Sequence, residues 1–385
     1  MIKEIKAKSI LRKYKKIDSW FISHYGMNLY RGCIHNCVYC DGRSEGYHVA
    51  GDFGEDVAVK INAINVLRRE LDLRRKRVPL KRSFVMVGGG VSDSYQSIEK
   101  KYQLCRKAVH LLFEYDLPVH ILTKSTLIER DADILKKINQ TSRVIVSVSF
   151  SSVNDTISSF LEPGVPTPSE RLQTLAFFKK EGIACGMFLL PVIPFLTDTR
   201  EAIEETVREA KNVGVDFIIF GGMTLKEGKQ KDYFYAKLKK TYPELMTRYH
   251  NIYLGDRWGN ATEAYYNSIH SVFNSIAKKY NIPKRIPPIL FKDILSENDL
   301  VIVILEHIDY LLKMEGKQSP YGVAAYSISQ FPKSLSTISG KLQELKGVGK
   351  TTEGIILEIL RTGRSLYYEQ LLTNKEKKEA EQKTI

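Results

Sequence analysis

Residues 31–40 read RGCIHNCVYC. This stretch holds Cys33, Cys37 and Cys40, three of the five cysteines in a chain of 385 residues. Five cysteines are too few for a disulfide scaffold at this length, so a close cluster favours a metal site or redox chemistry. Thiolates bind zinc and iron–sulfur clusters. The remaining alternative is that all three are free thiols buried as small side chains.

His35 raises the question of which metal. It could join the cysteines in a Cys3His zinc site. However, it lies two residues from both Cys33 and Cys37, which is a cramped geometry for one tetrahedral ion. We therefore expect His35 to be a loop residue near the metal. Three cysteines leave one position for a non-protein ligand, and the cysteines alone leave zinc and iron–sulfur both open.

Short apolar strands alternate with amphipathic helices on both sides of this stretch. The predicted strands are 27–30, 83–87, 119–123, 143–150, 183–190 and 215–220. The predicted helices between them include 96–115, 131–138, 169–181 and 199–212, with Ser169 as a helix cap. Strand–helix repeats predict parallel βα units. Six strands are too few for a closed eight-stranded barrel, so the fold class is α/β with a partial (βα)6 barrel.

The remaining sequence divides the chain further. The proline-rich segment NIPKRIPP at 281–288 predicts a domain boundary, with an all-α domain after it. The expected units are a basic N-terminal arm (1–26), the partial barrel (27–230), a helical extension (231–282), a linker (283–297), the all-α domain (298–372) and a charged tail (373–385).

The net charge of +14 is concentrated in patches. Basic residues cluster at 68–77, at 225–240 and in the N-terminal arm, and such patches attract polyanions, of which nucleic acid is the usual one. The sequence contains no apolar run of about 18 residues, so it predicts no membrane-spanning helix. The first 18 residues lack the apolar segment of a signal peptide, so we expect a cytoplasmic protein without a membrane partner.

The pattern C-x3-C-x-aromatic-C after the first strand of a partial barrel resembles the radical S-adenosylmethionine (radical SAM) superfamily. The resemblance implies a 4Fe-4S cluster held by Cys33, Cys37 and Cys40, with the fourth iron free to chelate S-adenosylmethionine. It implies a 5′-deoxyadenosyl radical that takes hydrogen from the substrate, and an electron donor such as flavodoxin or ferredoxin. Tyr39 would pack over the cluster and cofactor.

Other strand ends agree with this resemblance. Gly88, Gly89 and Gly90 end the second strand, where backbone can approach the methionine amino group closely. Lys124 ends the third strand, where a cation could pair with the methionine carboxylate. Ser149 is one of three serines on one face of the fourth strand, and its hydroxyl could meet the ribose.

Several segments over about residues 8–240 resemble the branch of the superfamily around spore photoproduct lyase, which splits a cross-linked thymine dimer in DNA. That enzyme has a hydrogen-donating cysteine in a segment that would align near Gly90, and this chain has none there. We therefore expect a different lesion or substrate. Asp93 and Tyr95 lie beside the predicted pocket and are candidates for a catalytic role, although plain polar lining is the simpler interpretation. Cys105 and Cys185 are expected in the core.

The segment 342–363 carries a G-V-G turn between two predicted helices. Backbone N–H groups at the second helix's start would bind a phosphate, assisted by Lys350 and Thr351. The residues of this predicted nucleic-acid site are Gly347, Val348, Gly349, Lys350 and Thr351. Residues 298–372 resemble the N-terminal helical domain of X-family DNA polymerases. Ile355 stands where some of those domains carry a lyase lysine, so the resemblance implies DNA-backbone binding without lyase activity.

Three functions follow, in order of preference. The first is a radical SAM enzyme acting on nucleic acid, with DNA repair favoured because the barrel and the all-α domain point there independently. The second is a radical SAM enzyme whose target is RNA, a protein or a small molecule. The third is a non-catalytic, metal-containing nucleic-acid-binding protein. A helical packing or dimerisation role is the alternative for the C-terminal domain.

Overall fold

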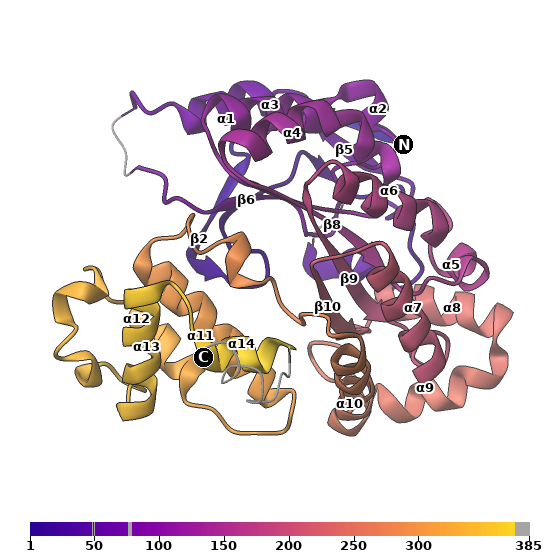
Figure 1. The fold of residues 1–385 in the computed structure, drawn as a ribbon. Coiled ribbons are helices and arrows are strands. Elements are labelled where there is room, and N and C mark those ends of the chain that lie inside the picture. The colour runs from indigo at the N-terminus through magenta and orange to yellow at the C-terminus, as the bar shows by residue number, and fades with distance from the viewer. Residues whose placement is uncertain (48, 50, 76–78, 374–385) are drawn as a thin grey trace.

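The computed structural model describes residues 1–47, 49, 51–75 and 79–373. Its centre is a seven-stranded sheet in the order β10-β9-β8-β7-β6-β3-β2 (Figure 1). Its strands are β2 (Leu11–Asp18), β3 (Ser23–Met27), β6 (Phe84–Gly88), β7 (Val119–Thr123), β8 (Val144–Phe150), β9 (Ala184–Val192) and β10 (Phe217–Gly222). Within the described residues, six of these strands run parallel and β2 pairs antiparallel with β3. The predicted α/β class is therefore confirmed.

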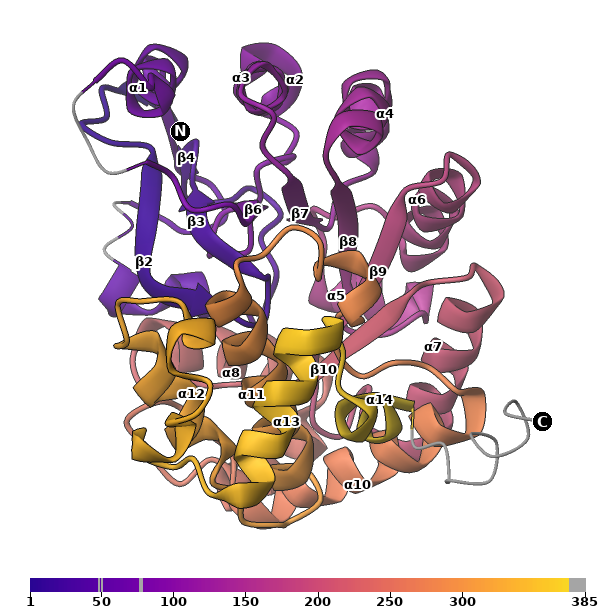
Figure 2. The same cartoon turned by 60° about the vertical axis from the view of Figure 1, so that its left-hand side comes forward.

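Helices cover the outer face of the sheet, and Figure 2 shows them standing outside the arc of strands. The helices up to residue 280 are α1 (Ala63–Leu71), α2 (Glu99–Tyr102), α3 (Leu104–Glu114), α4 (Ala132–Thr141), α5 (Asp155–Leu161), α6 (Pro168–Lys180), α7 (Arg200–Asn212), α8 (Lys229–Thr241), α9 (Met246–Ile252) and α10 (Glu263–Tyr280). The apolar stripes of α1, α3, α4, α6, α7 and α10 pack on the strands in one core. Helices α5, α8 and α9 instead share a separate apolar cluster with Cys37, Val38 and Tyr39. No helix in the described part of the chain is long and apolar enough to cross a membrane.

The first barrel strand differs from the prediction. The sequence predicts a strand over 27–30, whereas β3 ends at Met27 and Tyr30–Arg31 form the short β4 of a second sheet with β1 (Ile2–Ile5) and β5 (Val57–Lys60). The basic arm also contributes β2. Its lysines are mostly solvent-exposed while Leu11 and Ile17 are buried, so charge hides the strand pattern in the sequence.

The cap of α6 also differs. The helix begins at Pro168, and Thr167 is its N-cap: the Thr167 hydroxyl accepts from the Glu170 amide while the Glu170 carboxylate accepts from the Thr167 amide. Ser169, the predicted cap, donates to Asp155 Oδ2 over 2.8 Å instead. Proline fixes the helical φ of a first-turn residue, which places the cap one residue before it.

The C-terminal helices are α11 (Glu297–Lys313), α12 (Tyr321–Ser329), α13 (Lys350–Thr362) and α14 (Leu366–Thr373). Figure 2 shows α11 and α13 in front of the gap between the edge strands β2 and β10. They share one apolar cluster with residues of the barrel interior such as Phe84, Phe188 and Phe217. The C-terminal helices therefore close the open side of the partial barrel.

The segment 283–297 is not a spacer, contrary to the prediction of a linker. Ile286, Phe291 and Ile294 are buried in that same cluster, and the Ile218 amide of β10 donates to the Pro283 carbonyl over 2.9 Å. A partial barrel leaves apolar interior side chains uncovered, and the apolar residues of this segment cover them. Of the predicted charged tail, residues 374–385 lie outside the described residues.

Polar contacts join the two parts as well. The imidazole of His24 on β3 lies 3.0 Å from Asp299 Oδ2 on α11, and both side chains are buried. Arg143 pairs with Asp293 at 2.8 Å, and Lys16 pairs with Glu306. Barrel and C-terminal helices therefore form a single packed unit.

Candidate active site

A cavity of about 390 Å³ opens at the carboxyl ends of the parallel strands. Parallel α/β proteins bind ligands at this end of their strands. The cavity brings together predicted site residues from four separate segments: Cys33, Cys37, Cys40, Gly89, Gly90, Asp93, Lys124 and Ser149. Trp20, Phe21, Phe188 and Leu190 provide an apolar wall.

The three clustered thiols are free and face this one cavity. Burial, with the nearby Asp93 carboxylate, raises the pKa of the Cys33 thiol to about 12, and burial raises the pKa of Cys37 and Cys40 as well. Metal binding at this site would therefore release protons, because thiolates are the ligands. Three thiols on one loop beside a cavity match the donor set of an iron–sulfur cluster.

His35 does not complete a zinc site. Its Nδ1 lies 2.9 Å from the Gly164 carbonyl oxygen, and its Nε2 lies 3.2 Å from Asp93 Oδ2. Both ring nitrogens thus face protein groups. Among the described residues, no three His, Cys, Asp or Glu side chains surround a position for a single metal ion.

Asp93 connects the second and third strand ends. Its carboxylate accepts from the Thr123 hydroxyl and from the Lys124 amide, both over 2.7 Å. Burial alone would raise the pKa of Asp93, but His35 and these donors hold that pKa below its usual value. The carboxylate is therefore charged, fully occupied as an acceptor, and holds Lys124 at the rim of the cavity.

Lys124 reaches across to the fourth strand. Its ammonium donates to Ser149 Oγ over 2.7 Å and lies 3.1 Å from Glu162 Oε1. Ser149 in turn donates to the Leu190 carbonyl of β9 over 3.0 Å. The predicted cation and hydroxyl therefore lie side by side on one wall of the cavity.

Glu162 was not predicted from the sequence. It is buried and accepts a hydrogen bond from the Tyr39 hydroxyl of the cysteine loop, while its other oxygen lies 2.5 Å from the Arg171 guanidinium. Burial alone would raise the pKa of Glu162, but Arg171 and Lys124 hold it far below its usual range. No local pattern marks this residue, since its partners lie elsewhere in the chain.

The segment Leu161–Gly164 clamps the cysteine loop through its backbone. The Val38 amide donates to the Leu161 carbonyl over 2.8 Å, and the Gly164 amide donates to the His35 carbonyl over 3.0 Å. A Cβ on Gly164 would stand 2.6 Å from the Ile34 carbonyl oxygen, so only glycine allows this approach.

The glycines after β6 have different roles. Gly88 has φ +90°, and a Cβ there would collide with the Leu122 carbonyl oxygen of β7. Gly88 does not line the cavity, whereas Gly89 and Gly90 do. A Cβ on Gly90 would meet nothing closer than Asn28 at 3.5 Å, so this is the position with room for a side chain.

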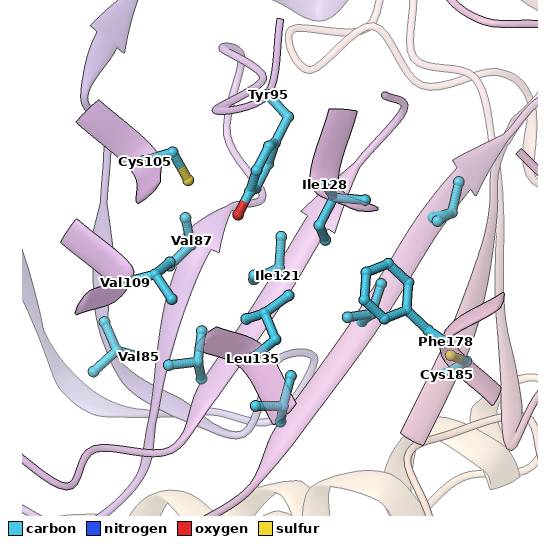
Figure 3. Close-up of a cluster of buried hydrophobic side chains, with 14 of the residues drawn as sticks. Val85, Val87, Tyr95, Cys105, Val109, Ile121, Ile128, Leu135, Phe178 and Cys185 are labelled. Atoms are coloured by element: carbon cyan, nitrogen blue, oxygen red, sulfur yellow. The ribbon is translucent and has the colours of Figure 1, made fainter. Parts of the chain in front are cut away.

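Tyr95 does not belong to the site. Figure 3 shows it between the sheet and the helices on the outer face, near Cys105 and Ile128. It is fully buried, and burial raises its pKa well above the usual value. Tyr95 follows Asp93 by two residues, but the chain turns away from the cavity between them. Cys105 and Cys185 are core residues, as predicted.

The G-V-G turn directly precedes α13, but the predicted helix before it is only a short 3-10 helix, Leu342–Glu344. Gly347 has φ +85°, and a Cβ there would stand 2.7 Å from the Ala324 amide nitrogen. Val348 is buried, and Gly349 is the N-cap of α13 without a side chain to satisfy the first amides. Lys350 and Thr351 are exposed beside them.

Comparison with known proteins gives the same two parts. A family model described as the radical SAM superfamily matches residues 27–201, and a helix-hairpin-helix domain model matches residues 296–365. An uncharacterised protein of Mycobacterium tuberculosis is 32% identical over 254 residues, which are 65% of this chain and 73% of the relative. An uncharacterised protein of Methanocaldococcus jannaschii is 29% identical over 221 residues, 57% of this chain and 77% of the relative.

Among solved structures, spore photoproduct lyase complexed with a dinucleoside spore photoproduct is similar with a TM-score of 0.54 and 15% identity. The match covers 72% of this chain and 79% of the lyase. At this identity the likeness concerns the fold.

Proposed function

The chain belongs to the radical SAM superfamily, and from this we propose that it is a radical SAM enzyme acting on nucleic acid, with DNA repair or modification as its role. The observation that carries the proposal is the cavity that unites three free thiols with Lys124 and Ser149. A helix-hairpin-helix domain packed on the same barrel supports a nucleic-acid substrate.

We propose that Cys33, Cys37 and Cys40 hold a 4Fe-4S cluster and that S-adenosylmethionine occupies the cavity beside them. When bound, this pair supplies a 5′-deoxyadenosyl radical, which takes hydrogen from the substrate. The protein's own contribution is binding and orientation. The Leu161–Gly164 clamp fixes the thiol-bearing loop, and the apolar wall excludes water from the cavity.

Charge favours a carboxylate next to Lys124. The buried group contains two cations, Lys124 and Arg171, against the single carboxylate of Glu162. Arg171 is fully buried, so the Lys124 ammonium is the cation of this group that lines the cavity and can meet an anion there. We therefore assign Lys124 to the methionine carboxylate, with the Ser149 hydroxyl beside it for the ribose. Gly89 and Gly90 line the cavity at the end of the neighbouring strand β6.

The substrate is proposed to differ from that of spore photoproduct lyase. Among the described residues that line the cavity, the thiols are those of the three clustered cysteines, and position 90 is glycine. A cysteine hydrogen donor at that place is thus absent from the described site. We propose that the hydrogen returned to the substrate radical comes from the cofactor itself or from another group next to the substrate.

Labelled substrates test the proposed reaction. The reconstituted full chain is incubated without oxygen with S-adenosylmethionine and deuterated oligonucleotides, some carrying ultraviolet lesions. We expect deuterium to appear in 5′-deoxyadenosine, or in S-adenosylmethionine if it is regenerated. Transfer from labelled RNA or peptide alone would contradict a DNA substrate while keeping the radical reaction.

Recruitment of DNA is tested by Lys350→Glu. Lys350 is exposed, so the variant should fold normally. We expect weaker DNA binding and a salt dependence reduced by about one counterion. Lys137→Glu on α4 is the matched control, since Lys137 is also exposed. Equal affinities for both variants and the unmodified chain would refute hairpin recruitment. Gly347→Val is less informative, because its side chain would strike α12.

A further inference from the structure

Helix α8 packs directly on the cysteine loop. The Gln230 side chain donates to the Tyr39 carbonyl over 2.9 Å, and the Arg43 guanidinium lies 3.5 Å from the centre of the Tyr233 ring. Just before the helix, Lys226 pairs with Asp41 at 2.8 Å. One face of α8 therefore covers the loop that carries the clustered thiols.

The solvent-exposed side of α8 is basic and begins next to Tyr233, because Lys229 and Lys237 lie one helical turn before and after that residue. Its exposed cations are Lys229, Lys237, Lys239 and Lys240. None of these four ammonium groups has an ion pair with a described acidic residue, while Asp232 is the exposed acid on the same helix. We call these four residues the α8 lysine face. The charge of such a face attracts an acidic partner over a long range.

The position of the α8 lysine face suits electron delivery. Lys229 lines one hollow with Tyr233 and Arg43, and the Lys237 ammonium lies 5.3 Å from the centre of the Tyr233 ring. A partner bound to this face would therefore lie beside the segment that carries the clustered thiols. Figure 1 shows α8 on the opposite side of the molecule from α12 and α13. Nucleic acid held at the hairpin therefore leaves α8 free.

We propose that the α8 lysine face is the docking site of a small acidic one-electron donor of the flavodoxin or ferredoxin type. The inference rests on the proposed function, which consumes one electron per cofactor cleavage. The donor's reduced flavin or iron–sulfur centre is oxidised by one electron, and the cluster is reduced by that electron. Complementary charge steers such encounters and sets their rate more than their final affinity.

The test compares two reductants on one variant. The triple variant Lys237→Glu, Lys239→Glu, Lys240→Glu is reconstituted without oxygen, and cluster reduction is followed with reduced flavodoxin and with dithionite. We expect flavodoxin to reduce this variant at least about tenfold more slowly than the unmodified chain at low salt, with the dithionite rate unchanged. Dithionite is small and needs no docking site.

A second triple variant, Lys100→Glu, Lys137→Glu, Lys180→Glu, is the matched control. It makes the same change in net charge with exposed lysines on other helices. We expect its flavodoxin rate to stay within about twofold of the unmodified chain.

Equal flavodoxin rates for the two triple variants would overturn the proposed docking site. A loss of DNA affinity in the α8 triple variant but not in the control would also overturn the docking site, because it would assign these lysines to nucleic acid. If dithionite cannot drive cofactor cleavage by the unmodified chain, the proposed function fails and the docking inference fails with it.

Discussion

Glu162 shows what a single residue contributes to this site. Its carboxylate is bound by Tyr39, Lys124 and Arg171, which come from three separate segments. The first is part of the cysteine motif, and the second is the proposed cofactor cation. A buried carboxylate between two cations thus connects the cysteine loop with the wall of the cavity that carries Lys124. The cysteine motif and a strand end mark Tyr39 and Lys124 in the sequence as candidate site residues. Nothing local marks Glu162, because only long-range packing brings it to them.

Replacing Glu162 by glutamine keeps the shape and removes the charge. Lys124 and Arg171 would then be left buried without an anion, and breaking a buried pair costs about 3–5 kcal/mol. We expect Glu162→Gln to lower the free energy of urea unfolding by that amount. Glu114→Gln, which breaks an exposed pair with Arg68, should cost no more than about 1 kcal/mol. Equal losses in the two variants would contradict the role of burial.

At the scale of elements, apolar composition made most strands predictable, and charge hid the others. β8 and β9 are nearly uninterrupted apolar runs, so their existence follows from sequence alone. Lysines interrupt the apolar residues of β2, and the prolines around Ile286 give that segment the composition of a linker. The proximity of the predicted site residues was also predictable. These residues follow parallel strands, whose carboxyl ends lie at one edge of the sheet. The helices of the all-α domain were predictable, but their position over the open side of the barrel was not, since no local pattern records which surface they cover.

The end of β6 offers a test of this element-level account. Gly88 has positive φ and a backbone oxygen where a Cβ would stand, whereas Gly90 has neither constraint. We expect Gly88→Ala to destabilise the fold by about 1–3 kcal/mol. Gly90→Ala should leave stability within about 0.5 kcal/mol. Thermal unfolding of both variants measures the difference, and a larger loss at position 90 would contradict the described strand end.

For the whole molecule, the C-terminal helices are structural as well as a candidate DNA-binding domain. They cover the barrel interior, so the two parts share one core. A chain ending at residue 288 would expose Phe84, Phe188 and Phe217 to water. We expect it to lose its near-ultraviolet circular dichroism and to bind a hydrophobic dye. A chain ending at residue 373 should keep the native spectrum. A folded, monomeric short chain would show that the barrel stands alone.

The contact between the two parts also makes stability depend on pH. The Nε2 of His307 donates to the Ser19 carbonyl over 2.7 Å, and the Tyr368 hydroxyl donates to Nδ1 over 2.6 Å. Burial, with Arg285 nearby, lowers the pKa of His307 to about 3, and burial lowers the pKa of His120 to about 4. An unfolded histidine has a pKa of about 6.5, so at lower pH the unfolded chain binds protons that the folded chain does not.

The stabilisation from these histidines is therefore complete above about pH 6.5 and is lost as pH falls toward their folded pKa values. We expect the free energy of urea unfolding to decrease between pH 6.5 and 5, by up to about 1.4 kcal/mol per pH unit for each histidine. His307→Gln should reduce this slope by removing one titrating group. An unchanged slope in that variant would show that His307 is protonated alike in both states.

The central claim is that the three clustered thiols hold an iron–sulfur cluster that works with S-adenosylmethionine. The direct measurement is anaerobic reconstitution of the full chain with iron and sulfide, followed by dithionite, S-adenosylmethionine and quantification of 5′-deoxyadenosine. We predict a brown protein with about four irons per chain, formation of 5′-deoxyadenosine, and loss of both in Cys33→Ala. A colourless, zinc-binding protein that forms no 5′-deoxyadenosine would contradict the claim.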